Sequence, residues 1–110
     1  MRTQIYKGRD GWKAETVVPL EGDEIKKGER ILQLTTRKSD RGLVTSASVA
    51  VKTDFGFTFA IYQDYHKSVT LSKSRCTEKN VEVQHQAAVN DLQFLIQEAR
   101  AFYQNKGATA

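Results

Sequence analysis

Alternation of apolar and polar residues marks the first part of the chain. Residues 4–9 and 12–20 are rich in Tyr, Ile, Thr and Val and flank Asp10-Gly11, a dipeptide typical of type I′ hairpin turns. Alternate residues of the second arm share one face: Trp12, Ala14, Thr16 and Val18. Pro19 ends the pairing because it has no N–H to donate. The pattern predicts a first β-hairpin.

A second hairpin has the clearest β pattern in the sequence. Its arms are residues 30–38 and 43–52, joined by a turn at residues 39–42, and a charged loop of residues 21–29 precedes it. One face of the second arm is apolar: Leu43, Thr45, Ala47, Val49 and Val51. The other face is small and polar: Val44, Ser46, Ser48, Ala50 and Lys52.

Two further strands are expected before residue 73. Residues 55–62 place Phe55, Phe57, Phe59 and Ile61 on one aromatic side. A short strand over residues 67–72 is expected to point Val69 and Leu71 inward. The strands therefore lie within residues 3–72 and number five or six.

The apolar period changes near Asn80. Residues at spacings of three and four follow: Val81, His85, Ala88, Leu92, Leu95, Ala99 and Phe102, widened by Val89, Ile96 and Tyr103. This predicts one amphipathic helix over residues 80–105, with Thr77 or Asn80 as N-cap, an end near Gly107 and a frayed tail at 106–110. The fold class is α+β, an antiparallel β-meander packed against one long C-terminal α-helix.

Composition limits the classes of protein that the chain can represent. With 110 residues, 39% hydrophobic and 27% charged, we expect one domain over residues 1–110, without a membrane span. The N-terminus lacks the apolar run of a signal peptide, which favours a cytoplasmic protein. The single cysteine, Cys76, with His66 and His85 gives too few ligands for a zinc site, and no nucleotide motif is present, so no metal or cofactor is expected.

Charge is the strongest pointer to function. The chain carries a net charge of +4. Residues 26–52 hold seven basic residues against two acids, a local charge of +5. A second basic cluster follows Tyr62 and Tyr65: Lys67, Lys73, Arg75 and Lys79. Cations beside aromatic rings are the elements of a single-strand binding surface, with the cations on phosphates and the rings on bases.

The leading hypothesis is therefore a small module that binds single-stranded DNA or RNA, without catalysis. The predicted phosphate-binding residues are Arg30, Arg37, Lys38, Arg41, Lys52, Lys73 and Arg75, and the predicted stacking residues are Trp12 and Tyr62. The competing structural interpretation places these cations at solvated strand ends and turns, and packs Trp12 into the sheet. Falling affinity with rising salt separates the two interpretations.

The expected order of strands and one helix resembles the outline of Whirly-type single-stranded DNA-binding proteins. In that family a basic sheet grips the strand and the helices help the protein to dimerise. The resemblance implies a nucleic-acid partner and a homodimer.

Two other classes of function compete with this hypothesis. The helix repeats apolar residues at a spacing suited to pairing with a second copy, which favours a homo-oligomeric interaction domain. A small enzyme requires Asp64, His66 and Cys76 to meet in one pocket. His85 lies on the apolar stripe of the helix, where a packing role is favoured over a ligand role.

Overall fold

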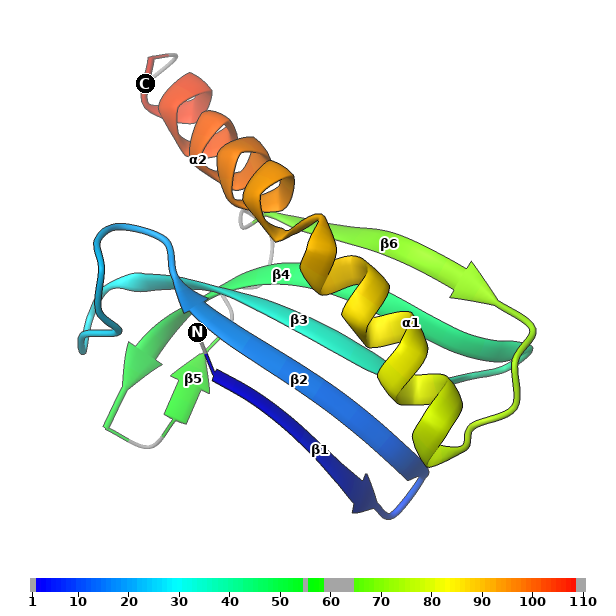
Figure 1. The fold of residues 1–110 in the computed structure, drawn as a ribbon. Helices are drawn as coiled ribbons and strands as arrows, with labels where there is room; N and C mark the ends of the chain where they lie inside the picture. The colour runs from blue at the N-terminus through cyan, green and yellow to red at the C-terminus, as the bar shows by residue number, and fades with distance from the viewer. Residues whose placement is uncertain (1, 55, 59–64, 109–110) are drawn as a thin grey trace.

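Two β-hairpins open the chain and form the larger part of one antiparallel sheet (Figure 1). The computed structural model describes residues 2–54, 56–58 and 65–108. The first hairpin joins β1 (Arg2–Gly8) to β2 (Gly11–Pro19), and the second joins β3 (Arg30–Ser39) to β4 (Gly42–Thr53). Neighbouring strands follow chain order from β1 to β4. This confirms the predicted meander.

The second edge of β4 carries two short strands. β5 (Gly56–Thr58) pairs with the end of β4, and β6 (His66–Ser72) pairs with its beginning. In the predicted aromatic strand of residues 55–62, only β5 belongs to the described residues; Phe55, Phe59, Ile61 and Tyr62 lie outside them. Every pairing in the described part of the sheet is antiparallel.

Both hairpin turns are followed by a glycine with a positive φ. Gly11 has a φ of 115° and Gly42 a φ of 154°, whereas no described residue other than glycine has a positive φ. Gly8 pairs with Gly11, so Arg9 and Asp10 are the central residues of the first turn. A type I′ turn requires a positive φ at both central residues. The predicted type I′ turn was therefore wrong, because the glycine follows the turn instead of forming it.

A β-bulge in β6 reverses the expected orientation of Leu71. Thr70 pairs with Thr45, and Ser68 pairs with the next residue of β4, Ser46. Val69 is therefore an extra residue without a partner on β4. An extra residue breaks the period of two, so the residues beyond it exchange faces. Val69 packs against the core as predicted, but Leu71 pairs with Val44 on the opposite face and is 71% exposed.

The C-terminal region is two helices, where one was predicted. α1 (Glu78–Asn90) begins at Thr77, its N-cap residue, whose side chain accepts a hydrogen bond from the backbone N–H of Asn80. After Asp91, α2 (Leu92–Ala108) follows. Asp91 has a φ of −96° and a ψ of 10°, outside the α region. Asn and Asp are weak helix formers because their side chains compete for backbone hydrogen bonds. The apolar spacing continues through this break, so periodicity alone did not reveal it.

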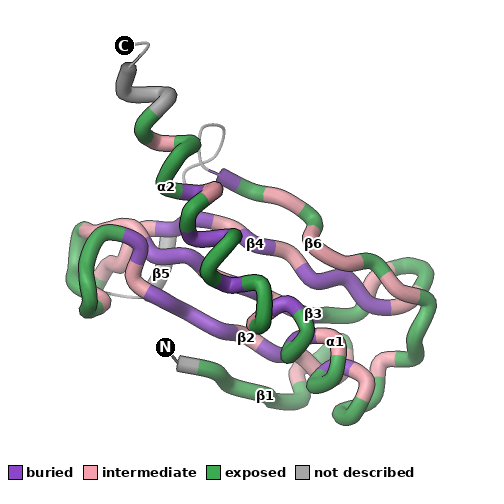
Figure 2. The backbone as a smooth tube through the Cα atoms, turned by 45° about the horizontal axis from the view of Figure 1, so that its top comes forward, coloured by how far each residue is buried: buried purple, intermediate pink, exposed green. Residues whose placement is uncertain are grey.

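The helices cover one face of the sheet, and the core lies between the helices and that face. The main buried cluster contains Val18, Leu20, Leu32, Leu34, Ala47, Val49, Tyr65, Ala88, Leu92, Leu95, Ile96 and Ala99. Figure 2 shows these buried positions along the central strands and on the inner side of the helices. On the opposite face, Ile25 of the loop 21–29 covers a smaller cluster of Val17, Ile31 and Ala50. The part of that face outside this small cluster is called here the open face.

A series of hydrogen bonds crosses the buried face beneath α1. His85 Nε2 lies 2.7 Å from Thr16 Oγ1, and its Nδ1 lies 2.8 Å from Thr36 Oγ1. Thr36 Oγ1 lies 2.7 Å from Thr45 Oγ1, which accepts a hydrogen bond of 3.1 Å from Gln84 Nε2. Burial lowers the pKa of His85 to about 4. His85 therefore has the packing role that its position on the stripe favours.

Candidate nucleic-acid interface

Five of the predicted site residues gather at one end of the sheet, around the β3–β4 turn: Arg37, Lys38, Arg41, Lys73 and Arg75. Arg9, in the β1–β2 turn, joins them. These six exposed side chains, called here the basic end, come from three separate segments of the chain. Arg9 was not among the predicted site residues, although the predicted first hairpin already placed it next to the turn.

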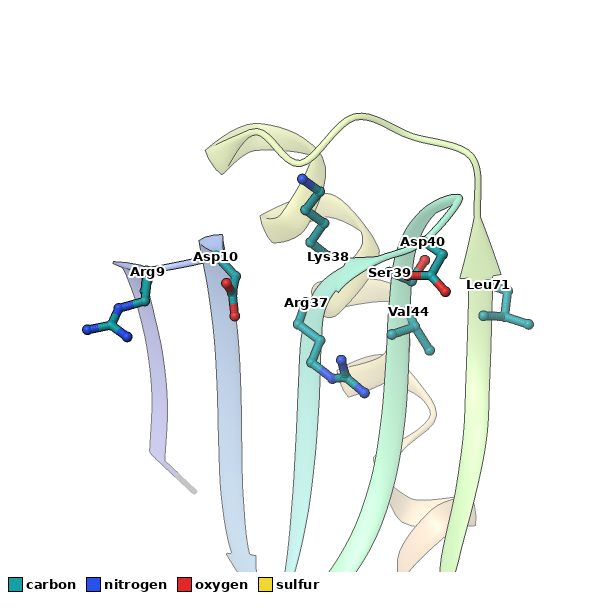
Figure 3. Close-up of a pocket in the computed structure, with 8 residues that line it drawn as sticks. All are labelled: Arg9, Asp10, Arg37, Lys38, Ser39, Asp40, Val44 and Leu71. Carbon is teal, nitrogen blue, oxygen red and sulfur yellow. The ribbon is translucent and has the colours of Figure 1, made fainter.

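The basic end contains a shallow depression of about 840 Å³ on the open face. It is lined by Arg9, Asp10, Arg37, Lys38, Ser39, Asp40, Val44 and Leu71. Figure 3 shows that β1, β2, β3, β4 and β6 run side by side here with the helices behind them, and that Arg37, Val44 and Leu71 come from three of these strands. Leu71 and Val44 form its apolar floor.

A second depression of about 430 Å³ lies on the other side of the same turn. It is lined by Lys38, Ser39, Asp40, Arg41, Gly42, Lys73, Ser74, Arg75 and Cys76. The two depressions share Lys38, Ser39 and Asp40, so they adjoin across the β3–β4 turn.

Gly42 holds this turn close to the segment after β6. A Cβ atom at Gly42 would lie 2.0 Å from the backbone oxygen of Ser72 and 2.7 Å from Lys73 Cα. Only a glycine permits this approach, and its φ of 154° also disfavours other residues. The contact brings Arg41 and Lys73 into the lining of one depression.

The basic end carries a net positive charge. Its six cations face two carboxylates in the same linings, Asp10 and Asp40. The ion pairs found among the described residues are Lys27–Asp54, Arg30–Glu21 and Lys67–Glu98, and none involves the basic end. Exposed cations grouped in this way raise the local concentration of anions.

Two predicted site residues, Arg30 and Lys52, lie at the opposite end of β3 and β4. Arg30 pairs with Val51, and β3 has ten residues, so this end lies about 30 Å from the β3–β4 turn. Arg30 forms an ion pair of 2.8 Å with Glu21, and its guanidinium lies 4.0 Å from the ring centre of Tyr103. The structure therefore does not bring Arg30 and Lys52 together with the basic end.

The predicted stacking residues do not cover the basic end in the described part of the chain. Trp12 is half-buried and packs with Ala14, Leu43 and Val81 on the helix side of the sheet. Tyr62 lies outside the described residues. The exposed apolar contact at the basic end is Leu71 instead, which sequence reasoning missed because it did not foresee the bulge.

Tyr65 joins β6 to α2. Its hydroxyl donates a hydrogen bond of 2.6 Å to Glu98 Oε1, which also accepts one of 2.9 Å from Lys67 Nζ. Burial, reinforced by the Glu98 hydrogen bond, raises the pKa of Tyr65 above its usual value. The hydrogen bonds from Tyr65 and Lys67 lower the pKa of Glu98. These contacts give Tyr65 and Lys67 a structural role between β6 and α2.

The residues of the enzyme hypothesis are not gathered by the described part of the structure. Cys76 Sγ donates to the backbone oxygen of Trp12 at 3.4 Å, at the end of the sheet that holds the β1–β2 turn. His66 hydrogen-bonds Ser48 at the other end of β6, and Asp64 lies outside the described residues. Within those residues, no three His, Cys, Asp or Glu side chains are grouped so as to hold a metal ion.

The fold and the basic end define a small α+β domain with a cationic sheet end. No known protein family, curated protein or solved structure matches the chain. Among the helices that the structure describes, none is both long enough and apolar enough to cross a membrane.

Proposed function

We propose that this protein binds single-stranded nucleic acid through phosphate contacts at the basic end. The supporting observation is the gathering of six exposed cations from three chain segments around two adjoining depressions. Nucleic acids present regularly spaced phosphates, and cations that neutralise several of them at once release the counterions bound there. The fold class by itself does not support this proposal, because one fold serves many functions.

The arrangement of the two depressions fits one strand better than a duplex. A single backbone laid over the β3–β4 turn passes from the first depression into the second. Its phosphates then lie near Arg9 and Arg37 on one side and near Arg41, Lys73 and Arg75 on the other. The guanidinium group binds phosphate oxygens with two parallel hydrogen bonds, which suits the arginine-rich composition of this surface.

Charge reversal at the basic end tests the proposal. We expect R37E/R41E to weaken binding of fluorescein-labelled oligodeoxycytidylate more than tenfold at about 50 mM salt, as measured by fluorescence anisotropy. The affinity of the wild type is expected to fall steeply between about 50 and 200 mM salt. In a plot of the logarithm of the binding constant against the logarithm of the salt concentration, each phosphate contact contributes about 0.7 to the steepness of the slope. The slope of the variant should therefore be shallower by about 1.4, because two contacts are lost.

A matched control separates local contacts from total charge. K26E/K27E lies in the loop 21–29, at the end of the sheet where Arg30 and Lys52 lie, and both double variants change the net charge of +4 to zero. The exposed Lys27–Asp54 pair contributes little to stability, so the control should remain folded. It is expected to keep its affinity within about twofold. Equal losses in the two variants, or an affinity insensitive to salt, would contradict the proposal.

A further inference from the structure

The first depression combines an apolar floor with positive charge. Leu71 is 71% exposed, and its partner Val44 on the neighbouring strand β4 is buried, with 9% of its surface exposed. Arg37 of β3 lies on the same face of the sheet (Figure 3). The protein core does not account for an exposed leucine here, because the bulge directs Leu71 away from the helices.

An acceptor group lies at the rim of this floor. In Figure 3 the carboxylate of Asp40, in the β3–β4 turn, is drawn at the end of the sheet near Val44, and Asp40, Val44 and Leu71 all line the depression. Asp40 has no ion-pair partner among the described residues. The site therefore offers an apolar surface, an anionic hydrogen-bond acceptor and a cation within one hollow.

A nucleotide matches these three features. A base has an apolar face and a polar edge, and its phosphate is an anion one sugar away. We propose that the first depression is a nucleobase subsite: the base packs on Leu71 and Val44, its exocyclic amino group donates to Asp40, and the adjoining phosphate contacts Arg37. This inference rests on the proposed function and adds a preference among bases.

Asp40 sets the direction of that preference. Cytosine and adenine carry an exocyclic amino group that donates to a carboxylate, whereas thymine presents the O4 acceptor at the equivalent position. A carboxylate facing that oxygen meets no donor and is repelled. An apolar side chain of a protein partner would cover Leu71 but would also leave Asp40 without a donor, so the amino-bearing base is the better occupant.

Three strands of equal length separate base contacts from phosphate contacts: oligodeoxycytidylate, oligothymidylate and an abasic phosphodiester. We expect the wild type to bind oligodeoxycytidylate about tenfold more tightly than the abasic strand, with oligothymidylate between them. L71A is expected to lose about fivefold in affinity for oligodeoxycytidylate and nothing for the abasic strand. V83A, which removes an exposed valine on α1, should leave both affinities unchanged.

Two further variants test the same contacts without removing surface. L71W offers a ring for stacking and is expected to tighten binding of oligodeoxycytidylate about threefold or more. D40N should remove the preference for oligodeoxycytidylate over oligothymidylate, because an amide both donates and accepts. Circular dichroism confirms that each variant is folded.

The outcomes distinguish this inference from the proposed function. Equal wild-type affinity for the cytidylate and abasic strands would overturn the base subsite, even if R37E/R41E still weakens binding. An unchanged preference in D40N, or equal losses of L71A on both strands, would overturn it as well. If R37E/R41E binds as the wild type does, the proposed function itself fails.

Discussion

His85 connects β2, β3 and α1 through a single side chain. Its two ring nitrogens contact the hydroxyls of Thr16 and Thr36. A neutral imidazole has one N–H donor and one acceptor, so one threonine accepts from the ring and the other donates to it. A protonated ring would present two donors and would place a charge in a layer where the neighbouring groups are uncharged. The network therefore depends on the neutral form.

This dependence predicts acid destabilisation. Burial lowers the pKa of His85 from 6.5 to about 4, so the unfolded chain binds more protons than the folded one between these values. The free energy of unfolding is then expected to fall as pH drops from about 6.5 to about 4, by at most about 3 kcal/mol. Urea unfolding at a series of pH values measures this change.

The matched variants are H85Q and H66Q. H85Q should be less stable near neutral pH and should lose most of the pH dependence between about 6.5 and 4. H66Q replaces the exposed histidine on the open face and should keep that dependence. Parallel pH profiles for the wild type and H85Q would refute the role given to His85.

The β3–β4 hairpin is the element that builds the candidate site. Its turn supplies part of both depressions, and Gly42 lets it approach the backbone at the end of β6. The hydrogen bonds of the strands set the direction of the hairpin, but this close contact sets the position of the turn. Gly42 therefore affects both the shape of the candidate site and the local stability of the fold.

G42A should damage both properties. A Cβ at this position overlaps the backbone oxygen of Ser72, and the φ of Gly42 is unfavourable for alanine. We expect a loss of more than about 1 kcal/mol in the free energy of unfolding, together with weaker nucleic-acid binding.

G22A is the control for a glycine-to-alanine change. Nothing lies within 4 Å of a Cβ at Gly22, so its stability should stay within about 0.5 kcal/mol of the wild type. Chemical denaturation of both variants measures the difference. A G42A variant as stable as G22A would show that the turn tolerates the displacement.

At the scale of the whole molecule, the buried core lies between the sheet and the helices, and the basic end lies outside it. Most of the helical stripe that suggested pairing with a second copy is buried against the sheet of the same chain, whereas Phe102 at its end is 38% exposed. The buried residues are Val81, His85, Ala88, Leu92, Leu95 and Ala99. Intrachain packing thus accounts for the spacing on which the oligomer hypothesis rested. The basic end lies at the edge of this packed body, where the turns meet solvent.

A monomer is therefore the expected state of the free protein. Static light scattering at increasing concentration should give a mass near 12.4 kDa throughout. A mass that doubles with concentration would favour the interaction-domain hypothesis. In that case, a substitution at Phe94, which is 60% exposed on α2, would test the helices as the contact.

Period and composition were sufficient for much of this architecture. The alternation in residues 12–18 and 43–51 grouped the residues of β2 and β4 by face correctly, because both strands pair with β3 without a register shift. The spacing after Asn80 located the buried helical stripe for the same reason, since a helix face follows directly from residue order. Charge counting found five of the six cations of the basic end.

Only tertiary pairing decided the remaining features. The bulge that exposes Leu71 exists because β6 is paired with β4, and no local pattern marks it. Arg30 and Arg37 belong to one basic segment of sequence, yet an extended strand places them at opposite ends of the sheet. Local sequence determines which way a side chain points within a regular element. The register and length of neighbouring strands determine which side chains finally meet.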